Sequence, residues 1–569
     1  MRGLLWKVLG RLSHYLRSLS CGPGESALVA ANRAFWPSQF PERGTRSGRF
    51  VLVEFQANPV IDLYNASFAA ITAQARGETP LFLARYFHDR ARVRVLRSYH
   101  PAAKIVFTNG PGFWAGRVAA LFRAWSAYRR IRSPAEILDF QVDGIRFGDL
   151  IYDNILIKGY ATIRRVDYRC LMVLYAFFAE RHVLRRILKR HPVGSAILSH
   201  TIGLMGGVFS RYLVQRGVEV INRVGADEIL LVKYRKLADI GFYPAKPEPR
   251  YFERMMSLPD HVVMPLAERY IDQRHSQGIK HIAVERAFKR DSRIFSSPRE
   301  FCEQYGLDPA KPVVFVMLHA FNDHPHSHFN RRMLYQDYYD WFEKTLAVAC
   351  RQPGVNWVFK EHPVADYYPT KDADLDAMFR DVREPHVLWL NRRADFNAFS
   401  IRNVAHAILT CLGTAGMEYA CFGIPCVLAG ESPFSGFGFT DEPATVADYE
   451  RRLETIASMP RLTPDQVKRA KLVMYFELEM CNALHYPFCR YYNFDEVLAV
   501  SADSVRRDGA RALETTDPAE FRHIIAVLTD FLRTPGWIQS LNFEKYPFMA
   551  DALGARMSAS AGVARCDVD

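Results

Sequence analysis

Short apolar runs alternate with longer amphipathic stretches through the first half of the chain. Runs of about four to eight apolar residues between turn residues are typical of buried strands, whereas apolar residues three and four positions apart are typical of helices. Strands that alternate with helices predict a doubly wound parallel sheet. The predicted strands cover residues 50–55, 81–86, 105–108, 196–199, 217–221 and 229–232.

The second half of the chain repeats this alternation. A charged helical span over residues 250–293 precedes it and bridges the two halves. The expected fold class is therefore α/β, with two Rossmann-like doubly wound domains that face a cleft. The predicted strands of the second half cover residues 312–318, 355–360, 387–390, 407–409 and 425–428.

The chain is too long for one hydrophobic core, because 569 residues exceed the usual size of a domain. A polar connector after the first helix and a change of pattern near the bridge suggest where the domains divide. The predicted boundaries are residues 1–47 for a basic helix and connector, 48–290 for the first Rossmann-like domain with the bridge, 291–500 for the second, and 501–569 for a helical tail with a frayed end.

The first segment predicts an amphipathic helix with basic flanks. Leu5, Val8, Leu9, Leu12 and Leu16 lie along one helical face, and four basic residues accompany them. A helix of this kind is typical of an anchor in the membrane interface, or else it packs on the protein's own core. Both interpretations remain open.

The net charge of +13 favours an anionic partner. An anionic membrane surface and an anionic sugar nucleotide both qualify, whereas no nucleic-acid-binding module is visible. No window approaches the length of a membrane-spanning helix. The ten cysteines form no CxxC pair, which favours reduced thiols in a cytoplasmic protein. We therefore expect a cytoplasmic protein that is associated peripherally with the inner face of the membrane.

Two predicted strands of the second half end in polar residues. Lys360, His362 and Pro363 follow the strand over residues 355–360, and a cation or a ring N–H at that place can donate to a phosphate oxygen. The alternative is that these residues only end the strand.

The next polar loop is rich in glycine and threonine. Thr410, Gly413 and Thr414 follow the strand over residues 407–409, and Glu418 lies one turn into the next helix. Glycine lets a backbone approach an anion, threonine supplies a hydroxyl, and the glutamate can accept the ribose hydroxyls. The alternative is a helix start followed by a solvent-facing glutamate.

The order of these two motifs resembles the donor half of GT-B glycosyltransferases. The resemblance is to capsular and surface polysaccharide transferases with a His-Pro motif, including Kdo- and sialyl-transferases. It also covers the stretches 148–153, 199–220 and 318–341. It implies that the first domain forms the acceptor side, and that the second binds a CMP- or UDP-linked sugar. The family's second motif carries adjacent serines, whereas this chain has Cys411 and Leu412 there.

Glycosyl transfer needs a base or carboxylate near the acceptor hydroxyl and a group that stabilises the leaving phosphate. Polar residues at predicted strand ends and helix starts are the candidates. For Asp149 and Asp153, the alternative interpretation is that they cap a helix or interact with its dipole. The catalytic candidates are Asp149, Asp153, His200, His319 and Asp323.

Two other patterns suggest a metal site, and neither is adopted. His324, His326 and His328 have a ligand-like spacing, but a solvated loop is the preferred interpretation. Asp372 and Asp374 match a DxD pattern, but they open a helix, where acidic residues suit the dipole. No obligatory metal or cofactor is therefore expected.

The predicted function is transfer of a sugar from a nucleotide sugar to a lipid-linked or polysaccharide acceptor in capsule or surface polysaccharide biosynthesis. Three alternatives remain: a CDP-linked polyol-phosphate transferase, a nucleotide-sugar epimerase and a non-catalytic assembly scaffold.

Overall fold

The computed structural model describes two compact units. Unit 1 comprises residues 1–126, 175–240 and 482–569, and unit 2 comprises residues 127–174 and 241–481. The described residues are 21–40, 47–85, 89–110, 113–224, 230–241, 252–253, 256–276, 282–289, 291–327, 332–480, 487–490, 492, 494–536 and 538–540. The predicted amphipathic helix in residues 1–19, His328 and the predicted frayed end lie outside them.

Unit 1 is built on a seven-stranded sheet. The strands lie in the order β14-β8-β7-β6-β1-β2-β3, and the five from β7 to β3 are parallel. These five follow the 3-2-1-4-5 order of a Rossmann fold, with the reversal of strand order between β1 and β6. The bounds are β1 (Phe50–Val53), β2 (Thr79–Ala84), β3 (Lys104–Phe107), β6 (Val193–Leu198), β7 (Glu219–Val224), β8 (Leu230–Tyr234) and β14 (Ile538–Ser540).

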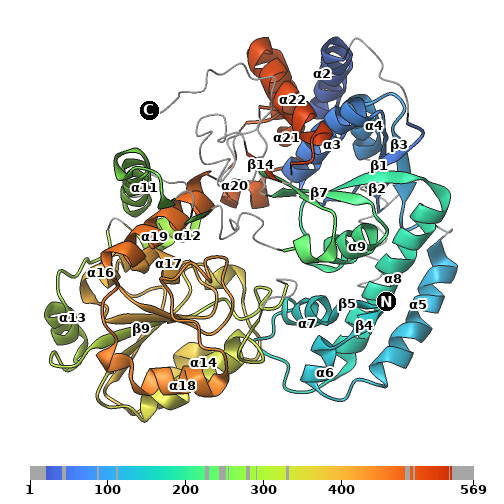
Figure 1. Ribbon diagram of the computed structural model, residues 1–569. Helices are drawn as coiled ribbons and strands as arrows, with labels where there is room; N and C mark the ends of the chain where they lie inside the picture. The colour runs from blue at the N-terminus through green and yellow to red at the C-terminus, as the bar shows by residue number, and fades with distance from the viewer. Residues whose placement is uncertain are drawn as a thin grey trace. The chain divides into compact units, whose positions relative to one another are not determined.

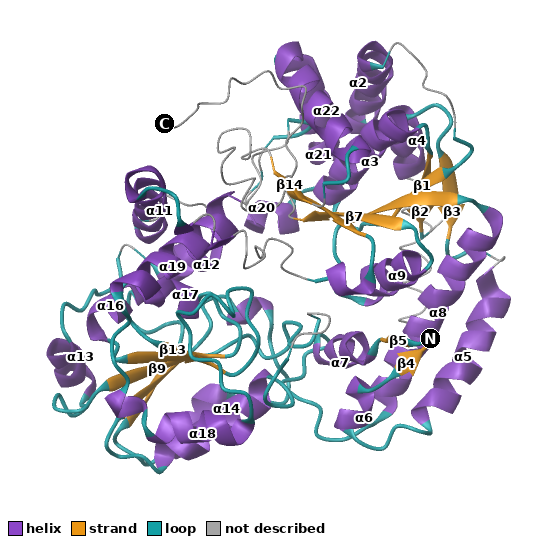
Figure 2. Ribbon diagram, in the orientation of Figure 1, coloured by secondary structure: helices purple, strands orange, loops and turns teal. Residues whose placement is uncertain are grey.

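Helices cover both faces of this sheet (Figure 2). Figure 1 shows α21 and α22, from the end of the chain, beside α2 and α3 from its beginning. The bounds are α2 (Pro23–Gln39), α3 (Pro59–Arg76), α4 (Arg90–Tyr99), α9 (Leu204–Gln215), η2 (Leu237–Asp239), α20 (Phe494–Ala499), α21 (Ala502–Thr515) and α22 (Pro518–Arg533). Two long helices, α5 (Trp114–Tyr128) and α8 (Tyr168–Arg190), contain the points where the chain passes from one unit to the other.

Unit 2 is built on a five-stranded parallel sheet with the order β11-β10-β9-β12-β13. This is again the 3-2-1-4-5 order, and here strand order reverses between β9 and β12. Every strand except the edge strand β11 is buried along most of its length because helices cover both faces. The bounds are β9 (Val313–Met317), β10 (Asn356–Lys360), β11 (Val387–Leu390), β12 (Ala407–Thr410) and β13 (Cys426–Leu428).

The core of unit 2 lies between this sheet and α14, where Trp341 and Trp357 are fully buried. A small hairpin of β4 (Gln141–Val142) and β5 (Ile145–Arg146) precedes α7. The helices are α6 (Pro134–Leu138), α7 (Gly148–Leu156), α11 (Asp260–His275), α12 (Ile282–Ala287), α13 (Pro298–Tyr305), α14 (Tyr338–Cys350), α15 (Leu375–Asp381), α16 (Ile401–Val404), α17 (Ala415–Ala420), α18 (Val446–Glu454) and α19 (Pro464–Tyr475), with short turns η3 (Ala365–Tyr367), η4 (Ala398–Ser400), η5 (Ile456–Ser458) and η6 (Phe476–Met480).

The predicted α/β class with two Rossmann-like sheets is confirmed, and so is the helical character of the described C-terminal region. One edge of the first sheet differs from the prediction, because β8 and β14 pair antiparallel to their neighbours. The division of the chain also differs from the predicted continuous domains. Residues 127–174, placed by sequence in the first domain, belong to unit 2, and the segment from residue 482 returns to unit 1.

Candidate functional site

The polar loops of unit 2 begin at the carboxyl edge of its sheet. His319 follows β9 and Thr410 ends β12, the two strands between which strand order reverses. The His319 Nε2 and Thr410 Oγ1 atoms are 3.1 Å apart. Ligands of open α/β sheets bind at this kind of reversal, so the two predicted residues lie where the fold favours a ligand.

The hydrogen bonds of His319 define which ring nitrogen carries the proton. Its Nε2 accepts the backbone N–H of Leu412 at 3.2 Å, while the Thr410 hydroxyl accepts the N–H of Gly413. Nε2 is therefore the unprotonated nitrogen, and Nδ1 carries the hydrogen. The ring stacks on Tyr338 with centroids 4.1 Å apart. Burial, and then the neighbouring His362, lower the pKa of His319 to about 3, so it is a neutral donor at neutral pH.

His362 and Lys360 lie at the end of the adjacent strand, β10. The Nδ1 atom of His362 accepts the N–H of Val364 at 3.4 Å, which leaves Nε2–H as a donor. Burial, and then the charge of Lys360, lower the pKa of His362 to about 4. Both histidines are therefore neutral, and the positive charge at this edge belongs to Lys360.

Lys360 is a buried cation, with 8% of its surface exposed. Burial lowers its pKa to about 8, against the opposing effect of Glu361. Its Nζ lies 5.9 Å from the ring centroid of Phe396. Among the described residues it forms neither a hydrogen bond nor an ion pair. A largely buried lysine without an ion pair has an electrostatic cost, which an incoming anion would reduce.

Lys360 and Pro363 line a pocket of about 220 Å³. Three of its arginines already pair with acids: Arg286 with Asp366, Arg392 with Glu361, and Arg393 with Asp376. Two of its cations, Lys360 and Lys289, have no ion pair within the described part of the chain. The pocket is thus positive, and its volume suits a phosphate or a ring rather than a whole sugar nucleotide. Its other lining residues are Leu390, Asn391, Ala394 and Phe396.

In the glycine-rich loop after β12, several backbone N–H groups that the sequence suggested for anion binding already donate hydrogen bonds within the protein. The N–H groups of Leu412 and Gly413 donate to His319 and Thr410, and those of Gly416 and Glu418 donate to carbonyls of the turn. A Cβ at Gly413 would lie 2.8 Å from Thr410 Oγ1, so glycine permits this close turn. The loop therefore uses much of its donor capacity to hold its own shape.

Glu418 is not the solvent-facing residue of the alternative interpretation. It is buried, and its Oε1 accepts hydrogen bonds from Arg274 at 2.5 Å and from the Thr414 hydroxyl at 2.9 Å. Burial alone would raise its pKa, but the charge and hydrogen bond of Arg274, with smaller contributions from His275 and Thr414, hold that pKa below its usual value. The pair joins α11 to α17 and fixes the loop that carries Thr414.

Asp149 and Asp153 lie on α7, which belongs to unit 2 rather than to the predicted first domain. A Cβ at Gly148 would lie 2.0 Å from the carbonyl oxygen of Leu138, so glycine lets α7 approach α6. Asp153 is fully buried, and it accepts the N–H of His326 and the hydroxyl of Ser327. Burial raises its pKa well above the usual value. Its contacts bind α7 to the loop after β9.

That loop contains the histidines for which solvation was expected, and the expectation is wrong for residues 324–327. His326 donates from Nε2 to the carbonyl of Gln336 at 2.6 Å and packs edge-on against Tyr152. The Tyr152 hydroxyl in turn donates to Asp337, also at 2.6 Å. Buried polar contacts, rather than solvent, hold this part of the loop.

The remaining acidic residues of unit 2 that the sequence singled out are Asp323, Asp372 and Asp374, and each lies in a different environment. Asp323 is half-buried, and burial raises its pKa to about 6, although a hydrogen bond with Tyr368 opposes the shift. Asp374 caps α15 by accepting the N–H of Ala377, as the sequence indicated, and Asp372 accepts the N–H of Ala161. The structure therefore gives the DxD residues ordinary structural partners.

Unit 1 has its own polar residues where strand order reverses. His200 follows β6 and is exposed, and Glu54 follows β1. Glu54 is 3% exposed, accepts hydrogen bonds from Ser199 and Gln56, and has its pKa raised to about 7, chiefly by burial. Glu54 is not among the candidate residues predicted from the sequence. The feature of the sequence that could have revealed it is a single carboxylate within the apolar run of residues 50–55.

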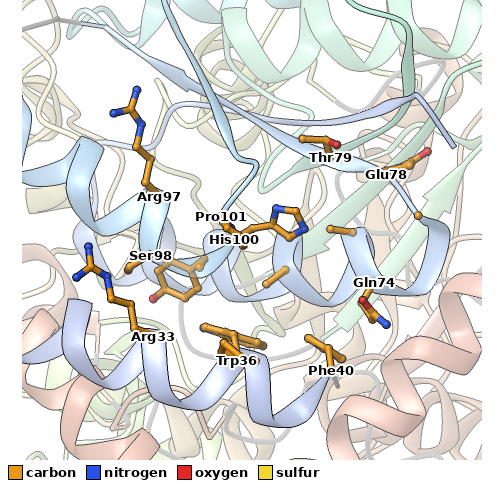
Figure 3. Close-up of a pocket in the computed structure, with 15 residues that line it drawn as sticks. Arg33, Trp36, Phe40, Gln74, Glu78, Thr79, Arg97, Ser98, His100 and Pro101 are labelled. Carbon is orange, nitrogen blue, oxygen red and sulfur yellow. The ribbon is translucent and has the colours of Figure 1, made fainter. Parts of the chain in front are cut away.

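A larger pocket, of about 620 Å³, lies elsewhere in unit 1 (Figure 3). It is lined by α2, by the end of α4 and by Glu78 and Thr79 at the amino end of β2. Glu54 and His200 lie past the carboxyl ends of β1 and β6, two other parallel strands of the same sheet. This pocket is therefore at the opposite edge of the sheet from them.

Comparison with known proteins finds no family model that matches the chain and no curated protein that matches it. Solved structures show a distant likeness. A Thermosulfurimonas dismutans KpsC, a β-Kdo 2,7-transferase, is 16% identical at a TM-score of 0.27, covering 51% of this chain and 80% of that one.

Two structures with bound nucleotides show a similar degree of likeness. The UDP-GlcNAc 2-epimerase of Neisseria meningitidis bound to UDP-GlcNAc is 8% identical at a TM-score of 0.22, over 75% of this chain and 98% of that one. Anabaena HepE in complex with UDP is 10% identical at 0.23, over 82% and 100%. Likeness at these scores assigns no function to this chain.

Replacing Arg274 with Met should lower the free energy of unfolding by about 3–5 kcal/mol, because it leaves the Glu418 carboxylate buried without a counter-charge. The double variant Arg274→Met/Glu418→Leu should recover most of that loss. Urea unfolding followed by tryptophan fluorescence measures both. If the double variant is no more stable than Arg274→Met, the pair does not have this role.

The same experiment has a defined pH dependence. Because the native pKa of Glu418 is depressed, the contribution of the pair is present above the usual glutamate pKa of about 4.3 and is lost as pH falls through the native value. The difference in stability between wild type and Arg274→Met should therefore shrink in acid.

Proposed function

We propose that this protein is a glycosyltransferase that moves a sugar from a CMP- or UDP-linked donor to a lipid-linked or polysaccharide acceptor in capsule or surface polysaccharide biosynthesis. The observation that supports the proposal is Lys360, a largely buried lysine that forms no ion pair with any described residue, beside His362 at the carboxyl edge of the second sheet. The polysaccharide pathway, the acceptor and a peripheral position at the inner face of the membrane belong to the proposal through the sequence resemblance.

Donor binding follows from the charges at this edge. The phosphate of the nucleotide supplies the counter-charge that Lys360 lacks, and the His362 Nε2–H and His319 Nδ1–H groups are the neutral donors that accompany it. The 220 Å³ pocket beside Lys360 and Pro363 takes one part of the nucleotide. Negative charge that develops on the leaving phosphate would be stabilised by the same groups.

Unit 1 contains a carboxylate with the properties of a general base. An acceptor hydroxyl must lose a proton as it attacks, and a base works best when its pKa lies near the working pH. Glu54 has that property, because burial raises its pKa to about 7, and it lies where ligands of such sheets bind. Glu54 is therefore the candidate base of unit 1, while Asp149 and Asp153 are positioning residues of the loop after β9.

Lys360→Met should weaken the binding of CMP, CDP or UDP, whichever binds best, by about ten- to a hundredfold, because one charge-assisted contact of roughly 1.5–3 kcal/mol is lost. Isothermal titration calorimetry on the full chain measures this. The matched control is Lys344→Met, which removes an exposed lysine of α14 and should bind as wild type does. Failure of the wild type to bind any of the three nucleotides would refute the proposal.

Nucleotide affinity should also fall as pH rises through about 8, because Lys360 then loses its proton. Lys360→Arg should bind with an affinity that stays constant over pH 7–9, since a guanidinium does not titrate there. Titrations at several pH values with one buffer series test this. An equal decline in both proteins would show that another group is responsible.

Glu54→Gln should lower the rate of sugar transfer by about 10²- to 10⁴-fold. Wild-type kcat/KM should rise with pH up to about 7 and then level off, and the variant should lack this break. Gln keeps a carbonyl oxygen for the Ser199 N–H, so the fold should persist. Asp149→Asn is the comparison variant, because it also removes a carboxylate charge but leaves Glu54 unchanged.

Product analysis with and without acceptor separates the alternatives. Turnover of a nucleotide sugar without acceptor indicates an epimerase, and a phosphodiester product from a CDP-polyol indicates a polyol-phosphate transferase. Nucleotide binding with no turnover of any donor indicates a scaffold.

A further inference from the structure

Helix α5 has an unusual distribution of apolar residues. Its small residues, Gly116, Ala120 and Ala124, are buried. Its large apolar residues are exposed instead: Trp114 by 62%, Val118 by 58%, Leu121 by 51%, Phe122 by 70% and Trp125 by 51%. Soluble proteins rarely expose a contiguous group of large apolar side chains, and such groups mark docking sites.

The exposed residues share one face of the helix. At about 100° per residue they fall within an arc of about 100°, and the three buried small residues lie on the other side of the axis. The buried face packs closely, since a Cβ at Gly116 would lie 2.0 Å from the ring of His182 on α8. The small residues therefore seat α5 on its own unit, while about half or more of each large apolar side chain stays exposed.

The sequence of α5 and of the four residues after it carries charge of one sign. Residues 114–132 contain five arginines and no aspartate or glutamate. Arg123 is exposed on α5, and Arg129, Arg130 and Arg132 follow within four residues of its end and are exposed as well. An apolar stripe with tryptophan and phenylalanine, accompanied by arginines, is the pattern of a helix that lies in a membrane interface.

The length of α5 fits a helix that lies in the plane of the membrane rather than one that crosses it. Fifteen residues span about 22 Å, less than the thickness of a bilayer core. Across the described residues, no helix is both long and apolar enough to cross a membrane.

We propose that the exposed apolar face of α5 inserts into an anionic lipid surface, with its arginines on the headgroups. The tryptophans and Phe122 supply the apolar contact, and the absence of acidic residues selects a negatively charged membrane. The proposal concerns α5 and not the predicted helix in residues 1–19, which lies outside the described residues. It does not depend on whether the protein transfers a sugar.

Vesicle sedimentation with the full chain tests the proposal. Wild type should bind phosphatidylcholine vesicles that contain phosphatidylglycerol and bind far less to phosphatidylcholine alone. The variant Phe122→Ser/Trp125→Ser should lose roughly tenfold or more in affinity. Ile294→Ser is the matched control, because Ile294 is also a half-exposed apolar residue, and it should bind as wild type does. Circular dichroism and the melting temperature establish that all variants are folded.

Charge and insertion are tested separately. Arg123→Gln/Arg130→Gln should lose about fivefold per arginine on anionic vesicles. Trp114→Phe/Trp125→Phe should keep its binding but show less tryptophan quenching by brominated lipid than wild type, because Phe preserves the apolar face. This result would place α5, rather than Trp6, in the lipid.

Three results would overturn the proposal. One is equal vesicle binding by wild type and Phe122→Ser/Trp125→Ser, and another is quenching that Trp114→Phe/Trp125→Phe leaves unchanged. The third is a wild-type dimer in light scattering that Phe122→Ser/Trp125→Ser converts to a monomer, with no vesicle binding by either. That outcome would assign the face to a second copy of the chain.

Discussion

The site in unit 2 depends on the register of its parallel strands. Lys360 pairs with Met317 across β10 and β9, and the N–H of Leu318 donates to the Lys360 carbonyl at 3.0 Å. On the other side of β9, the pairing of Leu409 with Val316 brings the end of β12 to the same level. Backbone hydrogen bonds therefore determine that His319, His362 and Thr410 begin their loops together. A shift of one residue in any of these strands would turn the polar side chains to the other face.

Around this edge, buried charged residues occur in two opposite arrangements. Arg274 and Glu418 neutralise each other and fix the turn after β12. Lys360 has no such partner among the described residues. Burial keeps the neighbouring imidazoles of His319 and His362 neutral, and the charge of Lys360 adds to this effect on His362. The first arrangement favours a rigid loop. In the second arrangement, an anion from solution would lower the electrostatic free energy of Lys360. The rigid neighbouring loop keeps the hydrogen-bond donors in place for that anion.

Much of the fold was predictable because strand and helix patterns are local. All five strands of unit 2 were predicted to within about two residues, as were the polar loops that follow β9, β10 and β12. Contacts between distant segments were not predictable. Arg274 lies 144 residues from Glu418, and Asp153 lies 173 residues from His326, so no local pattern links either pair. Glu54 was missed because its apolar neighbours marked it only as part of a strand.

Because unit 1 includes segments from both ends of the chain, the two units are completed at different times during synthesis. Leu28 and Leu63 are covered from the far end of the chain, where Gly509 of α21 packs against both, and Asp503 accepts the N–H of Gly24. Unit 2 is complete once residue 481 has been made, whereas unit 1 must wait for α21 and α22. A nascent chain would thus carry a finished second unit while the apolar surface of α2 and α3 is still open. Chaperone dependence should follow from this delay rather than from the size of the protein.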